Sequence, residues 1–592
     1  MPSSSTLVPL SAPDKAHFGL PDLPATLLAL QAEETIAFLG TCRLLVCRGG
    51  VDLLGTTLTA SRSNYPVFAP RSHAIPIITA LPASPSSSLK VLALPEHFEQ
   101  TCAQADAVVI LQELRSGVEG LGLVVPPFEG IFSPSSSTSE DWGLAGFQPL
   151  TSDTYALQPY TLPGSWARAV DGFVPQERDP LEEKLKGRVA LVRGMKNSGK
   201  STFARGLANQ LTTRYQRVAF LECDVGQSEF TPPGLVALHI LTCPHFGPSF
   251  THLLQPYKAH YVGSSSPRAD PSHYLAAIDA LLQTFRLDVQ FIPAYADSDS
   301  PAQADQADTR IADVVPLVIN SMGWTKGLGA RLMQQVEDLA SPTHIFEFSS
   351  LDGSTNPLDT FQPSSAWASR ERQVIPLEPV PPSPRLAQYS APLLRALGVM
   401  SYLHSAGEGT VKWTTALPLC AMLPWAVDPK LAFDQVVLVG PGAEDVVPSE
   451  VGTVLNGALV AFVALDEPAE HRPAAHAGHT LPYEQRRAPP SPFSSTCLGL
   501  GVVRSFHPTT GLMHVLTPLG PSQLSRARVL VKGELELPIY GFLDHRQTEE
   551  ERAKGLGGVE WGKVPYLEWG GSRGVGGERA RVRRNLMRRS HL

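Results

Sequence analysis

The sequence predicts an α/β fold in which a central P-loop NTPase domain, a mostly parallel sheet with flanking helices, lies between an N-terminal and a C-terminal β-rich domain. A glycine-rich loop at residues 194–201 follows the apolar run Val189–Arg193 and precedes a predicted helix from residue 201 to about 215. The next apolar run, Val218–Glu222, completes a strand–loop–helix–strand unit that is typical of a parallel sheet. Later β runs at 314–319 and 344–348 extend this sheet before a proline-rich linker at 376–384.

The chain is long enough for several domains. Its 592 residues exceed the roughly 250–300 residues at which a single core stops growing. We place an N-terminal β-rich domain with Ser/Pro-rich loops at 1–180, the P-loop domain with a lid at 181–405, and a C-terminal β-rich domain at 406–592. The last domain holds an insert at about 467–495, predicted to be disordered, and a basic tail at 579–592 with six arginines.

Composition excludes several classes of protein. The formal net charge of −8 gives no overall signal for nucleic-acid binding. The seven cysteines are scattered without a CxxC pair, which argues against a zinc ribbon or a disulfide framework and favours a reducing compartment. No signal peptide is recognisable at the N-terminus, and the longest apolar stretch, 451–465, is too short to span a bilayer. We therefore expect no membrane partner.

The loop Gly194-Met-Lys-Asn-Ser-Gly-Lys200-Ser201 matches the pattern G-x-x-x-x-G-K-[ST]. Glycines let successive backbone N–H groups point at phosphate oxygens, and the helix that follows adds its positive end. Lys200 is expected to bridge the β- and γ-phosphates, and Ser201 to ligate Mg²⁺. The residues predicted to bind ATP are Gly194, Met195, Lys196, Asn197, Ser198, Gly199, Lys200, Ser201 and Thr202. The alternative is a chance glycine–lysine turn, which the strand before and the helix after make unfavourable.

An acidic segment follows the next strand. A P-loop enzyme needs a carboxylate at the end of a neighbouring strand to hold the metal or accept a proton, and Glu222 and Asp224 fall there. Asp224 is the better candidate for both roles, although a carboxylate that only caps a turn is the alternative. The sequence Asp-Val-Gly-Gln ends in Gln227 instead of the glycine of the GTPase D-x-x-G, and no N-K-x-D motif follows, so a GTPase is disfavoured.

Five blocks occur in order along the chain. The first two are the phosphate loop and Asp224-Val-Gly-Gln-Ser-Glu-Phe-Thr-Pro-Pro-Gly234. The others are Tyr261-Val-Gly-Ser-Ser-Ser-Pro-Arg268, Asn320-Ser-Met-Gly-Trp324-Thr-Lys-Gly-Leu-Gly329 and Tyr389-Ser-Ala-Pro-Leu-Leu-Arg395. Together they resemble the polynucleotide 5′-hydroxyl kinases of the Clp/Grc type, over about residues 180–405. The Glu-Phe-Thr-Pro-Pro-Gly run is similar to the nucleolar, pre-rRNA-processing branch of that family.

The chain departs from the family pattern at four positions. Glu222 stands for the first Asp of D-x-D, and Ser265 and Ser321 each stand for a Thr. Those three replacements are chemically close. Leu393 stands for an Asp of the lid helix, so a charge is lost there and the local geometry of the lid is in doubt. Arg395 of the same helix is kept.

The resemblance implies transfer of the ATP γ-phosphate to a 5′-hydroxyl of RNA or DNA. For the nucleolar branch it implies pre-rRNA cut in an internal transcribed spacer by a HEPN-type endoribonuclease, with a 5′→3′ exonuclease acting afterwards, in the nucleus and nucleolus. The catalytic residues would be Lys200, Asp224 and Arg395, with Mg²⁺ on Ser201 and Asp224. The RNA contacts would be Gln227, Ser265, Trp324 and Lys326, with a base stacked on Trp324.

Two alternatives stay open from the sequence: an ATP-binding scaffold of an RNA-processing complex without turnover, and a small-molecule kinase. The basic tail, with Leu586 and Met587 as apolar anchors and Trp569 before it, is expected to dock on the endoribonuclease. A solvated end, a nucleolar address or an RNA contact are the other interpretations of that tail.

Overall fold

The computed structural model describes most of the chain. The described residues are 17–19, 24–83, 102–133, 142–150, 157–175, 187–291, 308–348, 372–406, 411–467, 481–507, 510–546, 555–556 and 559–560. Several sequence predictions lie outside these residues: the basic tail with Trp569, residues 468–480 of the insert, and most of the Ser/Pro-rich loops at 83–88 and 133–139.

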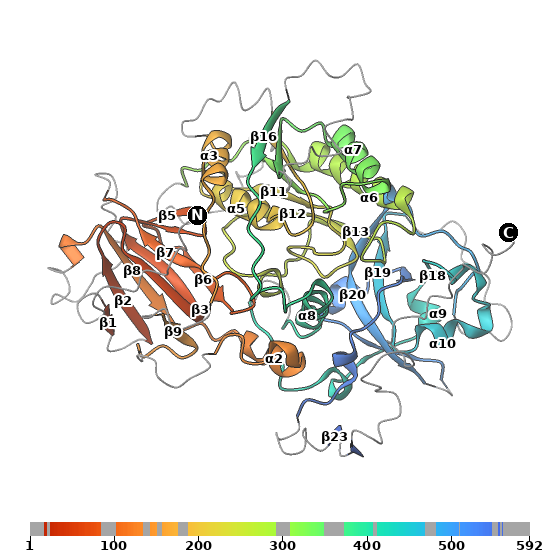
Figure 1. Cartoon of the computed structure of the whole chain (residues 1–592). Helices are drawn as coiled ribbons and strands as arrows, with labels where there is room; N and C mark the ends of the chain where they lie inside the picture. The colour runs from red at the N-terminus through yellow and green to blue at the C-terminus, as the bar shows by residue number, and fades with distance from the viewer. Residues whose placement is uncertain are drawn as a thin grey trace, which may run out of the picture.

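Among the described residues, the strands form three large sheets and one two-stranded pair, β23 (Gly555–Leu556) with β24 (Val559–Glu560). The sheets follow one another along the chain, and Figure 1 shows the first at the left, the second at the top and the third at the lower right. The first sheet has nine strands, mostly in the order β1-β2-β8-β3-β7-β4-β5, with β6 and β9 also paired to β3. Its strands are β1 (His17–Gly19), β2 (Ala25–Leu30), β3 (Thr35–Arg48), β4 (Gly50–Leu53), β5 (Thr56–Thr59), β6 (Asn64–Ala69), β7 (Ile77–Ala80), β8 (Ala107–Gln112) and β9 (Phe147–Pro149).

The central sheet has seven strands in the order β13-β12-β11-β14-β10-β15-β16. They are β10 (Val189–Arg193), β11 (Val218–Glu222), β12 (Leu235–Leu241), β13 (Lys258–Tyr261), β14 (Leu317–Asn320), β15 (His344–Phe348) and β16 (Gln373–Leu377). Only β12 runs against the other strands. The sequence places β10, β11 and β15 at their observed bounds, whereas the run at 314–319 forms a strand only from Leu317.

Helices cover both faces of the central sheet, as parallel strands require. Alternate side chains of β10 face opposite sides: Ala190 and Val192 pack under α3 (Gly164–Phe173) and α5 (Lys200–Thr212). Val189 and Leu191 pack under α6 (Pro271–Thr284) and α7 (Leu328–Ala340) on the other face. The phosphate loop thus connects a strand whose apolar side chains are buried on both faces to a helix that packs against the same sheet.

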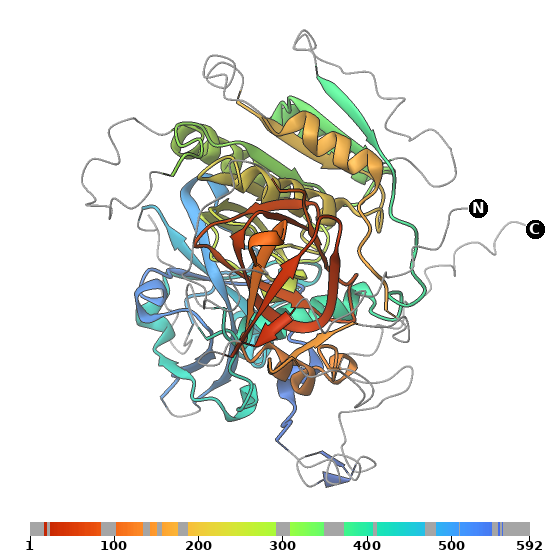
Figure 2. The same cartoon turned by 90° about the vertical axis from the view of Figure 1, so that its left-hand side faces the viewer.

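Helix α3 differs from the sequence prediction, in which residues 1–180 form strands and turns. Its Trp166 is 1% exposed and packs edge-on against Phe203 and Phe348, with ring centroids 5.5 Å apart in both pairs. Figure 2 shows α3, in orange, beside β16, in green. The predicted linker also differs, because Pro376 and Leu377 belong to β16. Residues from both sides of the predicted boundaries therefore complete the central layer.

The third sheet has six strands in the order β17-β21-β20-β19-β22-β18. They are β17 (Trp425–Val427), β18 (Gln435–Leu438), β19 (Leu459–Leu465), β20 (Ser495–Phe506), β21 (Met513–Leu516) and β22 (Val529–Lys532). The remaining α-helices that the structure describes are α2 (Leu121–Val124), α8 (Ala391–Leu403), α9 (Pro429–Ala432), α10 (Val451–Leu455) and α11 (Pro521–Leu524). No helix in the described ranges is long and apolar enough to cross a membrane.

The prediction of disorder at 467–495 is wrong for residues 481–495. Leu481 and Tyr483 are 8% and 7% exposed and pack in the core of the third sheet. The Tyr483 hydroxyl donates to the carbonyl of Val446 at 2.9 Å. Two buried side chains are enough to hold a proline-rich segment whose composition alone suggests disorder.

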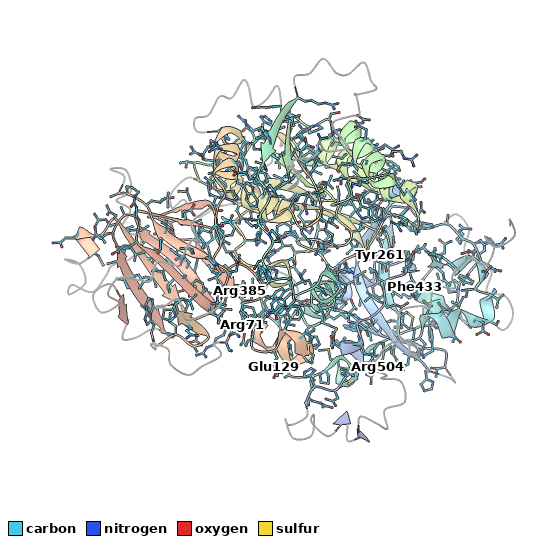
Figure 3. The ribbon with its side chains drawn as sticks, in the orientation of Figure 1. Arg71, Glu129, Tyr261, Arg385, Phe433 and Arg504 are labelled. Atoms are coloured by element: carbon cyan, nitrogen blue, oxygen red, sulfur yellow. The ribbon has the colours of Figure 1, made fainter. Side chains whose placement is uncertain are left out.

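A single apolar cluster joins the three sheets to the lid helix α8. It contains Phe68 of the first sheet, Leu235 of the second, Leu459 of the third and Met400 of α8. Tyr261, 5% exposed, belongs to the same cluster and lies where the central and third sheets meet (Figure 3). The lid helix is therefore part of the core and not a loosely attached segment.

Candidate active site

The phosphate loop takes a shape that its glycines require. Gly199 has a φ of +103°, and a β-carbon there would lie 2.8 Å from side-chain atoms of both Trp166 and Val380. A larger residue at this position would therefore push α3 and the segment after β16 away from the loop. Helix α5 begins at Lys200, so the loop wraps the end of the helix whose N–H groups are unpaired.

Lys200 is drawn into the loop. Its side chain is 6% exposed, and Nζ donates to the carbonyl of Met195 at 2.7 Å. Burial lowers the pKa of Lys200 to about 8, and the negative charge of Asp224 partly opposes that shift. An ammonium group held on a loop carbonyl is ready to exchange that contact for a phosphate oxygen.

The two acidic residues after β11 occupy different environments. Glu222 is fully buried and accepts the N–H groups of Asp224 at 2.7 Å and Glu229 at 3.0 Å, so its carboxylate organises the loop. Burial, followed by the charge of Asp224, raises the pKa of Glu222 well above its usual range. Asp224 is half-buried, and its Oδ1 accepts the N–H groups of Gly226 and Gln227 at 2.9 and 3.1 Å. Asp224 is therefore the accessible carboxylate.

The acidic strand is not the immediate neighbour of the P-loop strand, which corrects the expectation from sequence. β14 lies between β10 and β11, and it ends at Asn320. Asn320 Nδ2 donates to both carboxylate oxygens of Glu222 at 3.1 Å and to Ser201 Oγ at 3.3 Å. Asn320 Oδ1 is buried and has no partner among the described residues. The residue that links the loop to the acidic segment is thus an amide, which opens the fourth sequence block but was not assigned a role from sequence.

Arg395 approaches the same carboxylate from the lid. It is half-buried on α8; burial lowers its pKa, and the negative charge of Asp224 acts in the opposite direction. The helix is tied to the third sheet, because the backbone N–H of Leu500 donates to the Tyr402 hydroxyl at 2.9 Å. Leu393, where the resemblance implies an Asp, packs partly buried against the shared apolar cluster. An apolar contact therefore stands where the resemblance implies a charge, and Arg395 on the same helix is near enough for the charge of Asp224 to act on it.

The residues expected to contact RNA lie beside this centre. Trp324 is half-buried against the apolar cluster under α6 and α7, and Lys326, two residues later, is exposed. A β-carbon on Gly323 would lie 2.8 Å from Cα of Lys196, so the segment that carries Trp324 touches the phosphate loop.

The other two predicted RNA contacts lie on adjoining loops. Ser265 is exposed and its carbonyl would lie 2.9 Å from a β-carbon on Gly226, the residue before the half-buried Gln227. Sequence reasoning missed Arg268, whose guanidinium lies over the Trp324 ring, 5.1 Å from its centroid.

A buried ion pair behind the loop was also missed. Arg205 of α5 lies 2.6 Å from Glu229 Oε1, and His252 Nε2 lies 2.9 Å from the same oxygen. Burial alone would raise the pKa of Glu229, but Arg205 and His252 lower it to about 2. The pair joins the helix after the phosphate loop to the segment after Asp224, so it fixes the spacing between them. Two residues 24 positions apart carry no local signal of this contact.

Replacing Glu229 by Gln is expected to lower the free energy of unfolding by about 3–5 kcal/mol, because Arg205 would keep its charge without a buried partner. Denaturation of the variant and of wild type at pH 7 measures this. Since the carboxylate has a lowered pKa, its contribution is complete above pH 4.5 and is lost as the pH falls toward 2, so the two proteins should converge in acid. Glu484→Gln, which breaks the exposed pair with Arg487, should cost under about 1 kcal/mol. Equal effects of the two substitutions would contradict the structural role of Glu229.

The fold and the site define a P-loop phosphotransferase: a phosphate loop joins a strand of a mostly parallel sheet to a helix, and a half-buried carboxylate, Asp224, follows another strand of that sheet. Residues 194–405 match the family model described as mRNA cleavage and polyadenylation factor CLP1 P-loop. Residues 20–124 match the N-terminal domain of polynucleotide 5′-hydroxyl-kinase NOL9.

Curated relatives match nearly the whole chain. The polynucleotide 5′-hydroxyl-kinase GRC3 of Cryptococcus neoformans is 35% identical over 96% of this chain and 76% of its own length. Schizosaccharomyces pombe grc3 is 26% identical over 95% and 77%, and Danio rerio NOL9 is 28% identical over 86% and 71%. This chain belongs to the GRC3/NOL9 family of polynucleotide 5′-hydroxyl kinases. A solved structure of Clp1p with Pcf11p aligns over 86% of the chain and 98% of its own, with 14% identity and a TM-score of 0.47, too low to carry an argument.

Proposed function

We propose that this chain transfers the γ-phosphate of ATP to the 5′-hydroxyl of RNA, and that its RNA is pre-rRNA cut within an internal transcribed spacer during ribosome biogenesis. The observation that supports the chemistry is a phosphate loop in which Lys200 Nζ is held on the carbonyl of Met195, beside Ser201, which Asn320 connects to the segment of Glu222 and Asp224. Family membership supports the polynucleotide acceptor. The pre-rRNA substrate is supported by the Glu-Phe-Thr-Pro-Pro-Gly run at 229–234, which is similar to the nucleolar branch.

The loop residues Gly194 to Thr202 would hold the phosphates of ATP through their backbone N–H groups and the N-terminus of α5. Lys200 would leave the carbonyl of Met195 and bridge the β- and γ-phosphates. Since Lys200 has a pKa of only about 8 without nucleotide, phosphate charge would stabilise its protonated form.

The oxygen donors beside the loop fit Mg²⁺, which prefers hydroxyl, carboxylate and water oxygens. Ser201 Oγ would bind it directly, and Asp224 would hold it or its water. The buried Asn320 Oδ1, without a partner among the described residues, is a further oxygen on the same side. Bound Mg²⁺ supplies charge that neutralises the phosphates.

In the transfer step, Asp224 would orient the 5′-hydroxyl and accept its proton. Arg395 would neutralise the charge that develops on the phosphoryl group as it moves from the leaving oxygen to the acceptor. The backbone that carries each side chain is held in place. Glu222 accepts the N–H of Asp224, and α8, which carries Arg395, packs in the shared apolar cluster.

The acceptor strand would lie across the segments that adjoin this point. Its terminal base would stack on Trp324, while Lys326 is placed two residues away for a phosphate contact. Gln227 and Ser265, on the two loops in contact near Gly226, would contact the terminal nucleotide.

Trp324→Ala is expected to weaken binding of a 5′-hydroxyl oligonucleotide by about 1–3 kcal/mol, because one stacked base is lost. The KM for ATP should stay near the wild-type value. Steady-state kinetics with each substrate varied in turn separate the two constants. Trp425→Ala, which removes a half-exposed indole from the edge of the third sheet, should change neither. An unchanged oligonucleotide KM with a raised ATP KM would contradict the stacking role.

The proposed pathway includes two protein partners. A HEPN-type endoribonuclease would leave the 5′-hydroxyl, and a 5′→3′ exonuclease would remove the phosphorylated spacer, in the nucleus and nucleolus. The basic tail, outside the described residues, is the segment we assign to the endoribonuclease.

A coupled assay tests this role. Spacer RNA with a 5′-hydroxyl end is incubated with the kinase and ATP, and then with an exonuclease that requires a 5′-phosphate. Degradation that depends on both the kinase and ATP is expected. An ATP-binding scaffold would leave the RNA intact, and a small-molecule kinase would consume ATP only with another acceptor. RNA that keeps its 5′-hydroxyl end after incubation with the kinase and ATP would contradict the proposal.

A further inference from the structure

The exposed guanidinium of Arg268 lies over the ring of Trp324, the residue proposed above to stack the terminal base. Its central carbon is 5.1 Å from the centroid of the Trp324 ring, within the roughly 6 Å range of a cation–π contact. Arg268 forms no salt bridge with any carboxylate in the described part of the chain. Two other arginines of this domain are held by acids: Arg193 binds Glu337 and Glu347, and Arg205 binds Glu229. Arg268 is thus a surface cation that is held by an aromatic face and not by an acid.

The loop that carries Arg268 is fixed at both ends. On one side, the carbonyl of Ser265 packs against Gly226, in the loop organised by Glu222 and Asp224. On the other, Asp270 caps α6 by accepting the N–H of His273 at 2.9 Å. The loop therefore leads from β13 to α6 and touches the segment of Asp224 on the way, so Arg268 keeps a defined place relative to both that segment and Trp324.

This placement has a consequence for substrate choice. A free nucleoside and a polynucleotide present the same 5′-hydroxyl and the same base to Asp224 and Trp324. They differ in the phosphodiester that follows the first nucleoside, which is the nearest charge to the terminal base. A guanidinium in contact with the base platform is placed to meet that charge, and its planar fork can bind two phosphate oxygens while its face rests on an aromatic ring.

We propose that Arg268 binds the first phosphodiester of the acceptor strand and so makes the site select polynucleotides over nucleosides. Trp324 has two roles in this arrangement: it stacks the terminal base, and it holds the guanidinium where the phosphate arrives. The inference rests on the proposed function, and it adds a contact that none of the five sequence motifs assigns to Arg268.

The test uses two oligoribonucleotides with a 5′-hydroxyl that differ only at the first linkage, one natural and one a neutral methylphosphonate. For wild type, the neutral linkage is expected to lower kcat/KM by about 10–100-fold, the range of a charged hydrogen bond. Arg268→Ala should lower kcat/KM for the natural strand by a similar factor and abolish the difference between the two strands. The ATP KM should not change, and the salt dependence of oligonucleotide binding should weaken by close to one phosphate contact.

Two comparisons guard the result. Arg526→Ala removes an exposed charge from the third domain and should leave the effect of the neutral linkage intact. If Arg268→Ala folds poorly, a methylphosphonate moved to the third linkage still tests the proposal with wild type, because only the first linkage should be sensitive and equal sensitivity of both linkages would contradict it.

Three outcomes would overturn the inference. One is a wild-type enzyme that phosphorylates both strands equally. Another is an Arg268→Ala variant that still discriminates between them. The third is tighter oligonucleotide binding by that variant, which would make Arg268 a cover over the indole. If wild type phosphorylates no oligonucleotide at all, the proposed function is wrong, and the inference about Arg268 is wrong with it because it depends on that function.

Discussion

Asp224→Asn is expected to lower kcat for phosphate transfer by about 10²–10⁴-fold, with the fold and the ATP affinity close to wild type. The substitution keeps an oxygen that can accept the N–H groups of Gly226 and Gln227, so the loop should hold its shape. It removes the negative charge that would take the proton of the 5′-hydroxyl. Rapid-quench measurement of a single turnover with a 5′-hydroxyl oligonucleotide reports the chemical step directly.

The matched control is Asp338→Asn on the exposed side of α7, which makes the same chemical change outside the site and should leave kcat unaltered. Single-turnover rates of Asp224→Asn within threefold of wild type would remove Asp224 from the reaction. The catalytic carboxylate would then have to be sought elsewhere, since Glu222 is fully buried beneath the loop.

Arg395→Ala is expected to lower kcat by about 10³–10⁵-fold, the range of arginine side chains that stabilise a transferring phosphoryl group. ATP affinity should change little, because the developing charge and not the bound nucleotide is the target. Arg395→Lys keeps a positive charge without the planar fork, so it should recover part of the loss. A variant in which the ATP KM rises while kcat is preserved would show that Arg395 binds nucleotide in the ground state.

The central strands were predictable from sequence because their signals are local. β10 and β11 are apolar runs, buried on both faces, that end in Arg193 and Glu222. β15 has the apolar residues Ile345, Phe346 and Phe348, with Glu347 partly buried between them. The edge strand β16 escapes this signal, because Gln373, Val374 and Pro376 are exposed and a proline interrupts the run. Helix α3 was also not predicted, and the contacts that hold it, Trp166 with Phe203 and Phe348, join residues far apart in the sequence.

The identities of the proposed site residues were predictable from sequence because they lie in the five ordered motifs. The sequence could not show how Glu222 and Asp224 differ in role, since that depends on the complete burial of Glu222 and the partial exposure of Asp224. Asn320 reaches Ser201 only because β14 lies between two strands that are closer in sequence to each other. The contacts of Arg268 with Trp324 and of Arg205 with Glu229 are likewise set by tertiary packing, and no local pattern encodes them.

The central claim is tested most directly by following the γ-phosphate. A short RNA with a 5′-hydroxyl is incubated with γ-labelled ATP, Mg²⁺ and the wild-type chain, beside Lys200→Ala and the same RNA carrying a 5′-phosphate. The account predicts label on the 5′ end of the hydroxyl RNA alone, lost with Lys200→Ala and with chelation of Mg²⁺. Nucleotide binding by the folded wild-type chain without any transfer of label to the RNA would contradict it.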